Sequence, residues 1–454
     1  MKTITEPSRQ IPVIAHVDVL VVGGGPAGIM AAQAAARDPK LKVMLIESRS
    51  FLGGNLTIGL PILAFLGPKG NQVIWGGAQK FIDALRQRGA ASEHFPCALH
   101  KSYTIIDSDE AKTVAMEMMH NSGVQVRLYT FFSDVIKEGD SVKGVIVDSK
   151  AGREAILAKT VIDCTGDGDV AFRAGVECTK GDADGGMQPP TLMYLMKGVQ
   201  VQKLRDAIVS NPQDFDMDVM PKEQFARRHF ITVGLRNRIA LARESGIDVP
   251  VARTILITGL KEDEIWVNMV RVLGVDPTSP DSYTRGEFEG REQMYKITQY
   301  LKKFVPGFEN AWIDRVAPFM GIRESRVIVG KYVMTKEDIL EQHQFPDKIC
   351  KAGYPVDIHH SNGSDCTMIF NDDAYDIPYG VLVPAAVEGL LVAGRCSSMN
   401  HEAMAATRVM STCMALGEAA GTAARIALQS GVQPSCVDIS KVQADLLENG
   451  VYLG

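Results

Sequence analysis

Residues 17–28 of the chain read VDVLVVGGGPAG, and this stretch decides the fold. A short run of β-branched and other apolar residues ends at a cluster of glycines, and the alanine-rich segment 29–37 follows directly. A second apolar run, residues 42–46, ends at Glu47. This order predicts a strand, a glycine turn, a helix and a second strand. The first 47 residues are therefore expected to form one βαβ unit of an α/β fold.

The glycines of this turn follow the spacing Gly23-x-Gly25-x-x-Gly28. After a buried strand, the backbone N–H groups of such a turn can hold a pyrophosphate at the positive helix end, where a side chain blocks close approach. Glu47 follows 19 positions after Gly28, where a carboxylate accepts from ribose hydroxyls and repels the 2′-phosphate of NADP. A tight turn with an incidental acid is the alternative. We expect FAD or NAD to bind Gly23, Gly25, Pro26, Ala27, Gly28 and Glu47.

Composition narrows the class of protein. The chain has 454 residues, of which 46% are hydrophobic and 22% charged, and this is ordinary globular chemistry rather than disorder or fibre. Its 48 basic and 54 acidic residues leave a net charge of −6, so no basic excess is present to neutralise a phosphate backbone. A nucleic-acid partner is not expected, whereas a soluble enzyme is.

The cysteines and the hydropathy indicate a reducing compartment. None of the eight cysteines forms a C-x-x-C pair, the spacing that metals and redox dithiols need. No secretory signal is recognised in residues 1–16, and no run approaches the roughly 20 apolar residues of a membrane span. We therefore expect a cytoplasmic protein without a membrane span and without a metal site.

Further strands and helices follow along the chain. The first part predicts a glycine-rich loop, two helices and short strands: Ser50–Pro68, Gly76–Arg88, Ala111–Asn121, Val124–Tyr129, Val142–Val147, Ala155–Leu157 and a strand beginning at Thr160. Between about residues 181 and 362, two charged helices alternate with strands: Pro221–Ser245, Arg285–Phe304, Thr254–Gly259 and Ile265–Val270. The last part predicts a buried strand and a small-residue helix, Leu390–Arg395 and Ser411–Gln429.

Three separate segments carry a family resemblance. Residues 48–55 read SRSFLGGN, residues 165–169 read TGDGD, and residues 391–421 contain LVAGRCSS, HEA, TRVM and GEAAG in that order. Together with the glycine turn they resemble the FAD-dependent oxidoreductases of the glutathione-reductase-like fold, over about residues 17–428. Gly321–Arg326 and Tyr375–Tyr379 are also similar to one bacterial branch. The resemblance favours FAD over NAD.

The resemblance implies an architecture and a cofactor site. Residues 1–185 and 370–454 would form a Rossmann-like FAD-binding domain, and residues 186–369 an inserted α+β substrate or cap domain. The FAD would be non-covalent, because no His or Cys lies in Gly53–Gly70. Further cofactor contacts are expected at Ser48, Gly53, Gly54, Asn55, Ser133, Thr165, Gly166, Asp167, Gly394, Arg395, Arg408 and Met410. At Arg395 many relatives carry an acid, so its expected role is pyrophosphate pairing or none.

The carboxy-terminal helix has almost no side-chain bulk over residues 415–424, which read ALGEAAGTAA. An ordinary core helix carries Leu or Ile on its buried face, so we expect something large to come close. Close packing against another element is the alternative. A helix start near Ser411 would place the positive end of the helix dipole at the flavin.

Three residues are candidates for catalysis. His401, in a polar loop after the flavin strand, would take a proton as a hydride leaves for the flavin, although capping the loop is the alternative. Arg323 would orient a substrate carboxylate or pair with Glu324, and Arg408 would be a buried cation. The adjacent His359 and His360 face opposite ways on a strand, so a surface loop is favoured over a metal site.

The expected reaction is FAD-dependent dehydrogenation or oxidation of a small polar or anionic substrate. Reduction of a C=C bond in the manner of fumarate reductases, with Arg323 as the acid, is the first alternative. A binding module that has lost the flavin is the second. No second strand–glycine–helix pattern occurs in residues 181–362, so the electron donor or acceptor is unknown. The sequence leaves the oligomeric state open, a homo-oligomer included.

Overall fold

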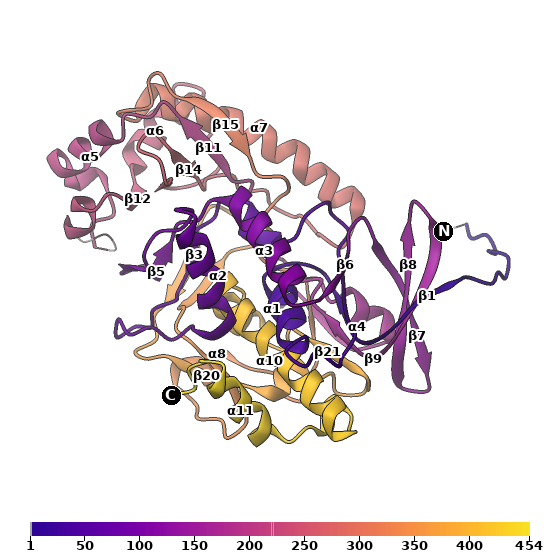
Figure 1. Ribbon diagram of the computed structural model, residues 1–454. Helices are drawn as coiled ribbons and strands as arrows, with labels where there is room; N and C mark the ends of the chain where they lie inside the picture. Colours follow the sequence, from indigo (N-terminus) through magenta and orange to yellow (C-terminus); the bar gives the residue numbers. More distant parts are fainter. Residues whose placement is uncertain (1, 219, 221) are drawn as a thin grey trace.

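The computed structural model describes residues 2–218, 220 and 222–454. It confirms the predicted βαβ unit: β1 (Val13–Val22), α1 (Pro26–Ala35) and β2 (Val43–Ile46) follow one another, and β1 pairs with β2 in parallel. The strand is apolar on both faces because helices and loops cover both sides of the sheet. Figure 1 shows α1 in the middle of the lower body, beside the yellow α10 (Met410–Ser430).

A sheet of seven strands forms the lower body. Its order is β6 (Gln125–Arg127), β2, β1, β9 (Gly152–Asp163), β8 (Ser141–Ser149) and β7 (Phe131–Glu138), with β21 (Leu390–Val392) on β9. The pairs among β6, β2, β1, β9 and β21 are parallel, whereas β7 and β8 are antiparallel. The carboxyl ends of β1, β2, β9 and β21 therefore lie at one edge, where ligands bind in open α/β sheets.

The small-residue helix α10 packs directly on α1. A Cβ atom added to Gly417 would lie 2.0 Å from the Ala27 carbonyl oxygen, and one on Gly421 would lie 2.1 Å from that of Ala31. All residues from Met410 to Ala427 are buried. The expectation of a large ligand over this face is therefore wrong: small side chains are needed because the two helix backbones approach closely.

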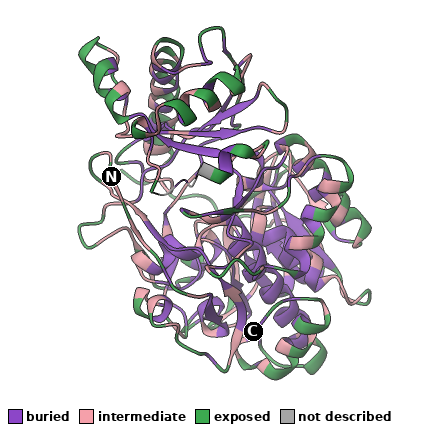
Figure 2. Cartoon of the chain, turned by 90° about the vertical axis from the view of Figure 1, so that its left-hand side faces the viewer, coloured by how far each residue is buried: buried purple, intermediate pink, exposed green. Residues whose placement is uncertain are grey.

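A second, antiparallel sheet forms the upper part of the molecule. Its order is β12 (Ile231–Gly234), β13 (Thr254–Thr258), β14 (Ile265–Val267), β11 (Tyr194–Lys197) and β15 (Trp312–Val316). The helices α5 (Val201–Ser210), α6 (Arg236–Glu244) and α7 (Pro280–Phe304) accompany it (Figure 1). The strands β11 to β14 are largely buried and line a separate apolar core, which Figure 2 shows as purple arrows beneath partly exposed helices, whereas the edge strand β15 is partly exposed.

Some predicted elements differ from the observed ones. Pro221 lies outside the described residues, and the helix predicted over 221–245 is in fact a 3₁₀ turn (Lys222–Ala226), the strand β12 and the shorter α6. The run Ile231–Gly234 is extended because it pairs with β13. The spacing of apolar residues along the chain does not reveal such a pairing with a distant strand. The two strands predicted at residues 155–157 and 160 are one continuous strand, β9.

The remaining strands and helices lie outside these two sheets. They are β3 (Ile62–Leu63), α2 (Gly76–Gln87), β4 (Phe95–Cys97), β5 (Lys101–Thr104), α3 (Ser108–Asn121), α4 (Asp169–Ala174), β10 (Cys178–Lys180), β16 (Arg326–Ile328), α8 (Lys336–Leu340), β17 (Lys348–Ala352), β18 (Val356–His359), β19 (Cys366–Ile369), β20 (Tyr375–Pro378), α9 (His401–Thr407) and α11 (Ile439–Glu448). Short 3₁₀ turns occur at Gly54–Thr57, Pro212–Asp214, Tyr379–Leu382 and Pro434–Cys436.

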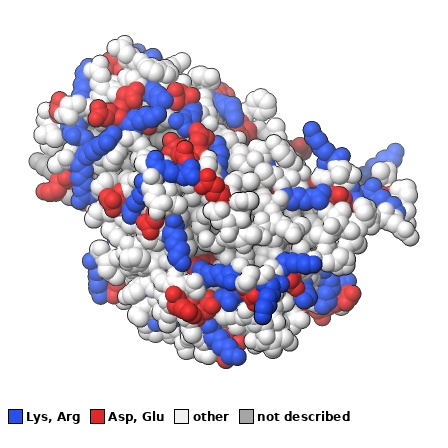
Figure 3. All heavy atoms as spheres, in the orientation of Figure 1, with Lys and Arg blue, Asp and Glu red and all other residues white. Residues whose placement is uncertain are grey.

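Two properties of the molecular surface and its helices complete the description. Basic and acidic side chains are interspersed over the face seen in Figure 3, as the near balance of 48 basic and 54 acidic residues leads one to expect. In the part of the chain that the structure describes, none of the helices combines the length and apolarity that crossing a membrane requires.

Candidate functional site

A cavity of about 340 Å³, here called the cofactor cavity, lies at the carboxyl ends of the parallel strands. Most of the predicted cofactor residues line it: Gly23, Gly25, Pro26, Ala27, Glu47, Ser48, Gly54, Asn55, Thr165, Gly166, Asp167, Gly394, Arg395, Arg408 and Met410. They come from the ends of β1, β2, β9 and β21 and from the start of α10. The fold thus brings together segments that are far apart in the sequence.

The glycine turn leaves room for a ligand at one position. A Cβ atom on Gly23 would lie 2.5 Å from the Cys164 carbonyl oxygen, and one on Gly28 would lie 1.8 Å from that of Gly23. Gly25, by contrast, has a φ of −77° that any residue adopts, and its Cβ would meet no atom within 4 Å. No side chain caps the first turn of α1. The space beside Gly25 and the free N–H groups of α1 therefore fit a pyrophosphate.

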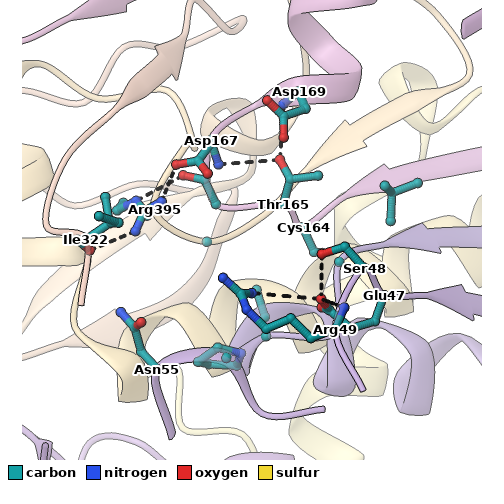
Figure 4. A pocket seen from close by; sticks show the side chains of 18 of the residues that line it. Glu47, Ser48, Arg49, Asn55, Cys164, Thr165, Asp167, Asp169, Ile322 and Arg395 are labelled. Carbon is teal, nitrogen blue, oxygen red and sulfur yellow. Dashed lines mark hydrogen bonds and ion pairs between the residues drawn. The ribbon is translucent and has the colours of Figure 1, made fainter. Parts of the chain in front are cut away.

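Glu47 stands at the edge of this cavity in a fixed orientation (Figure 4). Its side chain is buried, and one oxygen accepts a hydrogen bond from the Gly24 backbone N–H at 2.8 Å. The other oxygen accepts from the Ser48 hydroxyl at 3.0 Å and from the Arg49 N–H at 2.9 Å. Because these donors hold the carboxylate at the end of β2, it is placed as an acceptor for a ribose hydroxyl.

Arg395 closes the opposite wall and binds protein groups (Figure 4). Its Nε donates to the Gly166 carbonyl at 3.0 Å, its Nη1 donates to the Ile322 carbonyl at 2.7 Å, and its guanidinium pairs with Asp167. The predicted choice between pyrophosphate pairing and no role is therefore incomplete. Arg395 joins the loop after β9 to the segment that follows the second sheet, and so holds the cavity wall together.

Three predicted contacts do not line the cavity. Gly28 and Gly53 contact other residues of the glycine turn instead of the cavity. Gly28 packs on Gly23, and the Gly53 N–H donates to the Gly24 carbonyl at 2.8 Å. Ser133 lies half-buried one residue beyond the lining, which uses Thr130, Phe131 and Phe132 instead. Ile322, which also lines the cavity, belongs to the segment Gly321–Arg326 noted above, whereas four other lining residues from the second sheet region were not predicted: Pro277, Tyr283, Phe319 and Met320. No local motif marks them.

The start of α10 borders the cofactor cavity. Arg408, Met410 and Cys413 line it, and the helix begins at Met410 with no side-chain cap and no acid in its first turn. A helix of 21 residues carries partial positive charge at this end. The predicted placement of this helix start thus agrees with the structure, and the arrangement stabilises negative charge on a group bound there.

A smaller cavity of about 110 Å³, here called the substrate cavity, adjoins the first one. The two share Asn55, Ile322, Arg408 and Met410 as lining residues. Much of its wall is apolar: Ile231, Ile255 and Ile257 come from the second sheet, and Ile58, Leu60, Pro61 and Leu63 come from the segment around β3. Its charged and polar side chains are Arg253, Arg323, Arg408, Asp357, His100, His359, Tyr354, Asn55, Asn268 and Thr191.

The arginines of the substrate cavity outnumber its acids. Within the described residues, no carboxylate lies within the 4.0 Å of an ion pair from Arg323, whose Nη1 donates to the Pro189 carbonyl. Burial and the nearby Arg408 lower the pKa of Arg323 to about 9. Arg408 lies 3.8 Å from Asp357, and its buried Nε has no partner among the described residues. This excess of buried positive charge favours an anion in the cavity.

Asp357 is the one carboxylate among the described lining residues. It accepts a hydrogen bond from the Tyr354 hydroxyl at 2.9 Å. Burial works against its charge, but His359 and Arg408 overcome this and hold the pKa of Asp357 well below its usual range. Asp357 is therefore ionised at neutral pH and compensates for only one of the surrounding cations.

The histidines are placed differently from the sequence-based expectation. His401 lines neither cavity, because its Nδ1 contacts the buried carboxylate of Glu324 at 2.8 Å. His359 does line the substrate cavity, but Arg271 lies 3.3 Å from its Nδ1 and Asp357 lies 3.5 Å from its Nε2. The expectation of a surface loop is wrong for His359, which is largely buried at the end of β18.

His100 is the histidine that the sequence analysis missed. It follows β4 and lines the substrate cavity, and its ring lies parallel to Tyr354. Its Nδ1 is 3.7 Å from the Cys97 sulfur, whereas its Nε2 makes no hydrogen bond among the described residues. Burial, together with Arg253, lowers the pKa of His100 to about 4, so the ring is neutral at pH 7. In the described chain, no group of three or more His, Cys, Asp or Glu side chains is arranged to hold a metal ion.

Curated relatives match only part of the chain. Thiamine thiazole synthase of Desulfosudis oleivorans is 29% identical over 164 residues, which cover 33% of this chain and 56% of that protein. The enzyme of the same name from Aeropyrum pernix is 31% identical over 131 residues, or 29% of this chain and 43% of that protein. The chain thus spans about half the length of these relatives.

Solved structures and a family model match nearly the whole chain. A geranylgeranyl bacteriochlorophyll reductase-like protein from Thermoplasma acidophilum superposes with a TM-score of 0.51 and 16% identity, over 96% of this chain and 84% of that one. At this identity the likeness shows a shared fold. The family model described as FAD dependent oxidoreductase matches residues 18–446, which include every residue that lines the cofactor cavity. The chain therefore belongs to the FAD dependent oxidoreductases, and its cofactor is FAD.

Proposed function

We propose that the protein is an FAD-dependent dehydrogenase or oxidase of a small substrate that carries a carboxylate. The observation that carries this proposal is the pair Arg323 and Arg408: both line the substrate cavity, Arg408 at its boundary with the cofactor cavity, and Asp357 is the one carboxylate among the described lining residues. A buried cation without a partner is costly, and a substrate carboxylate removes that cost. The binding energy of the substrate would thus come from its carboxylate rather than from contacts to its reacting carbon.

The residues of the substrate cavity divide the work. Arg323 and Arg408 would bind and orient the carboxylate, and the apolar wall would exclude water. His100 Nε2, which has no protein partner among the described residues, would accept the proton of the substrate O–H or N–H group. The FAD supplies hydride acceptance, and the start of α10 would stabilise the negative charge that results.

We also propose that the fold is of the glutathione-reductase type, with residues 186–369 as the substrate domain. Supporting this, Arg253, Arg323, Asp357 and His359 all come from that segment, while Asn55 and Met410 come from outside it. The substrate cavity therefore forms where the inserted segment meets the cofactor cavity. Its specificity would change when the segment changes, without altering the FAD site.

The test uses matched pairs of acid and amide. The FAD-bound protein is mixed anaerobically with lactate and lactamide, glycolate and glycolamide, and alanine and alaninamide, and loss of flavin absorbance is followed. We expect at least one acid to bleach the flavin and its amide to react at least about 100-fold more slowly, because the amide cannot neutralise Arg323. Equal rates for acid and amide would refute carboxylate recognition.

One observation favours a second reaction, reduction of a C=C bond. The pKa of Arg323 is lowered to about 9 by burial and by Arg408, which makes its proton easier to donate than that of an ordinary arginine. In that case the protein reduced with dithionite would be reoxidised by fumarate or crotonate in the absence of oxygen. Reoxidation by an enoate, combined with no bleaching by any acid, would select this reaction.

A further inference from the structure

A third cavity of about 180 Å³, here called the outer groove, lies beside the substrate cavity. It shares Leu99, Arg253, Cys366 and Met368 with that cavity, and it adds Arg236, Ala252, Ser364, Asp365 and Phe370. Phe370 and Asp365 are exposed, so the groove reaches the molecular surface. The four shared side chains therefore lie between the substrate cavity and a groove that opens to solvent.

The opposite side of the substrate cavity is not a free path. There it meets the cofactor cavity at Asn55, Ile322, Arg408 and Met410. FAD bound in the cofactor cavity would occupy this boundary, because the reacting ring must face the substrate. A substrate that exchanges while FAD stays bound therefore needs another way in, and the outer groove is adjacent.

Among the four side chains that the groove shares with the substrate cavity, Arg253 is the charged one, whereas Asp365 lies on the exposed side of the groove. Arg253 Nη2 donates to the Cys366 sulfur at 3.0 Å, and the Arg253 side chain is 22% exposed. Asp216 lies 3.7 Å from Arg253 and 3.1 Å from Arg236, so one carboxylate serves two guanidinium groups. A sulfur atom is a weak acceptor, and an incoming carboxylate can replace it.

We propose that the outer groove is the port through which a carboxylate substrate reaches the flavin, and that Arg253 selects anions there. The choice of a carboxylate rests on the proposed function. An anion would first pair with Arg253 and Arg236, then pass Met368 and Leu99, and finally bind Arg323 and Arg408. Met368 is suited to this place because its flexible side chain can change rotamer as a ligand passes.

Cys366 provides a reporter for the charge selection. The FAD-bound protein is treated with iodoacetate, an anion, or iodoacetamide, its neutral counterpart, and alkylation of each cysteine is measured by peptide mass spectrometry. The selectivity is the ratio of the two rates at Cys366, in which the thiolate fraction cancels. The exposed Cys436, which lies outside the groove, is the reference in the same sample.

We expect Arg253→Gln to lower the selectivity at Cys366 by about 5-fold and to leave the selectivity at Cys436 unchanged. One nearby positive charge is expected to raise the rate of reaction with an anion by roughly that factor. The matched control, Arg285→Gln on the exposed face of α7, should change neither ratio. An unchanged selectivity at Cys366 in Arg253→Gln would overturn the assignment of Arg253.

A second measurement tests the route. Malonate binding is followed by stopped-flow as a change in flavin absorbance, in the wild type and in Met368→Trp. A bulkier side chain at the port should slow association at least about 10-fold while FAD content is retained; unchanged association would refute the route. If acids fail to bleach the flavin while Cys366 still selects iodoacetate, the proposed reaction fails and the port stands.

Discussion

The cofactor cavity and the substrate cavity share a boundary but present different chemical groups to a ligand. The cofactor cavity uses backbone geometry: a glycine turn, two helix starts and the fixed carboxylate of Glu47. The substrate cavity uses charged side chains from distant segments, with Arg253, Arg323, Arg408 and Asp357 lying in four different parts of the chain. The cofactor cavity therefore offers mainly backbone N–H donors to a ligand, whereas the substrate cavity offers buried charged side chains.

This difference indicates how each cavity responds to substitution. In the cofactor cavity the free volume beside Gly25 matters, so an added side chain excludes the ligand without disturbing a contact. In the substrate cavity the balance of buried charges matters, so removal of one arginine changes affinity without changing volume much. Variants of the two kinds should separate FAD content from substrate binding.

The largest effect is expected for Gly25→Val. The backbone at this position accepts a side chain, and the added methyl groups would occupy the space of the pyrophosphate. We expect protein that is folded, with a circular dichroism spectrum of the native type, and that purifies without flavin absorbance. Gly23→Val is the matched control: its Cβ would collide with the Cys164 carbonyl, so it should lose stability as well. A yellow Gly25→Val protein would contradict the assigned cofactor path.

Arg323→Met should weaken binding of the acid that bleaches the flavin by roughly 10³-fold. Leaving the substrate charge unpaired in a buried site costs about 2–5 kcal/mol. The FAD content should stay at the wild-type level, since Arg323 does not line the cofactor cavity. Arg285→Met, on the surface of α7, serves as the control. Unaltered affinity in the Arg323 variant would show that the arginine pair serves only the fold.

His100→Gln should slow flavin reduction roughly 10²-fold with unchanged FAD content, as expected when a general base is removed. The wild-type rate should also fall as the pH drops toward the lowered pKa of His100, about 4, because protonation removes the acceptor. This acidic decrease should be absent in the variant. His401→Gln is the comparison, since His401 contacts Glu324 and lines neither cavity. A larger loss in His401→Gln than in His100→Gln would reverse the assignment.

The smallest effect is expected on stability at His401. Burial works against its charged form, but the hydrogen bond and the charge of Glu324 raise the pKa of His401 above its usual range. A raised histidine pKa adds stability below the unfolded value, about 6.5, and the gain is lost as the pH rises through the folded value. His401→Gln should thus lose about 1 kcal/mol of unfolding free energy at pH 5.5, and less at pH 8.5. Urea unfolding at both pH values measures this, and a loss that grows with pH would exclude the ion pair.

The cofactor half of the site was predictable because its signals are local. The strand, the glycine turn and Glu47 occur within one βαβ unit, and backbone constraints dictate the residue type at Gly23 and Gly28. Arg323 was predicted as a carboxylate contact because it follows an apolar run, and Arg408 as a buried cation because it precedes the small-residue helix; both line the substrate cavity. Both kinds of signal need no knowledge of distant partners.

The other half depends on contacts between distant segments. His100 stands in no motif, and only the fold brings it beside Tyr354 in the substrate cavity. His401 looked catalytic from its position after the flavin strand, yet a glutamate 77 residues away binds its ring. The prediction of a helix over residues 221–245 was also wrong because of a distant contact: β12 is a strand because it pairs with β13.

The most direct test of the central claim is a titration of the FAD-bound protein with malonate, a carboxylate that donates no hydride, observed through the flavin absorbance. The account predicts a saturable spectral change in the wild type that Arg323→Met abolishes, because an anion would then bind beside the flavin through that guanidinium. A flavin spectrum that malonate leaves unchanged, or a change of equal affinity in Arg323→Met, would contradict it.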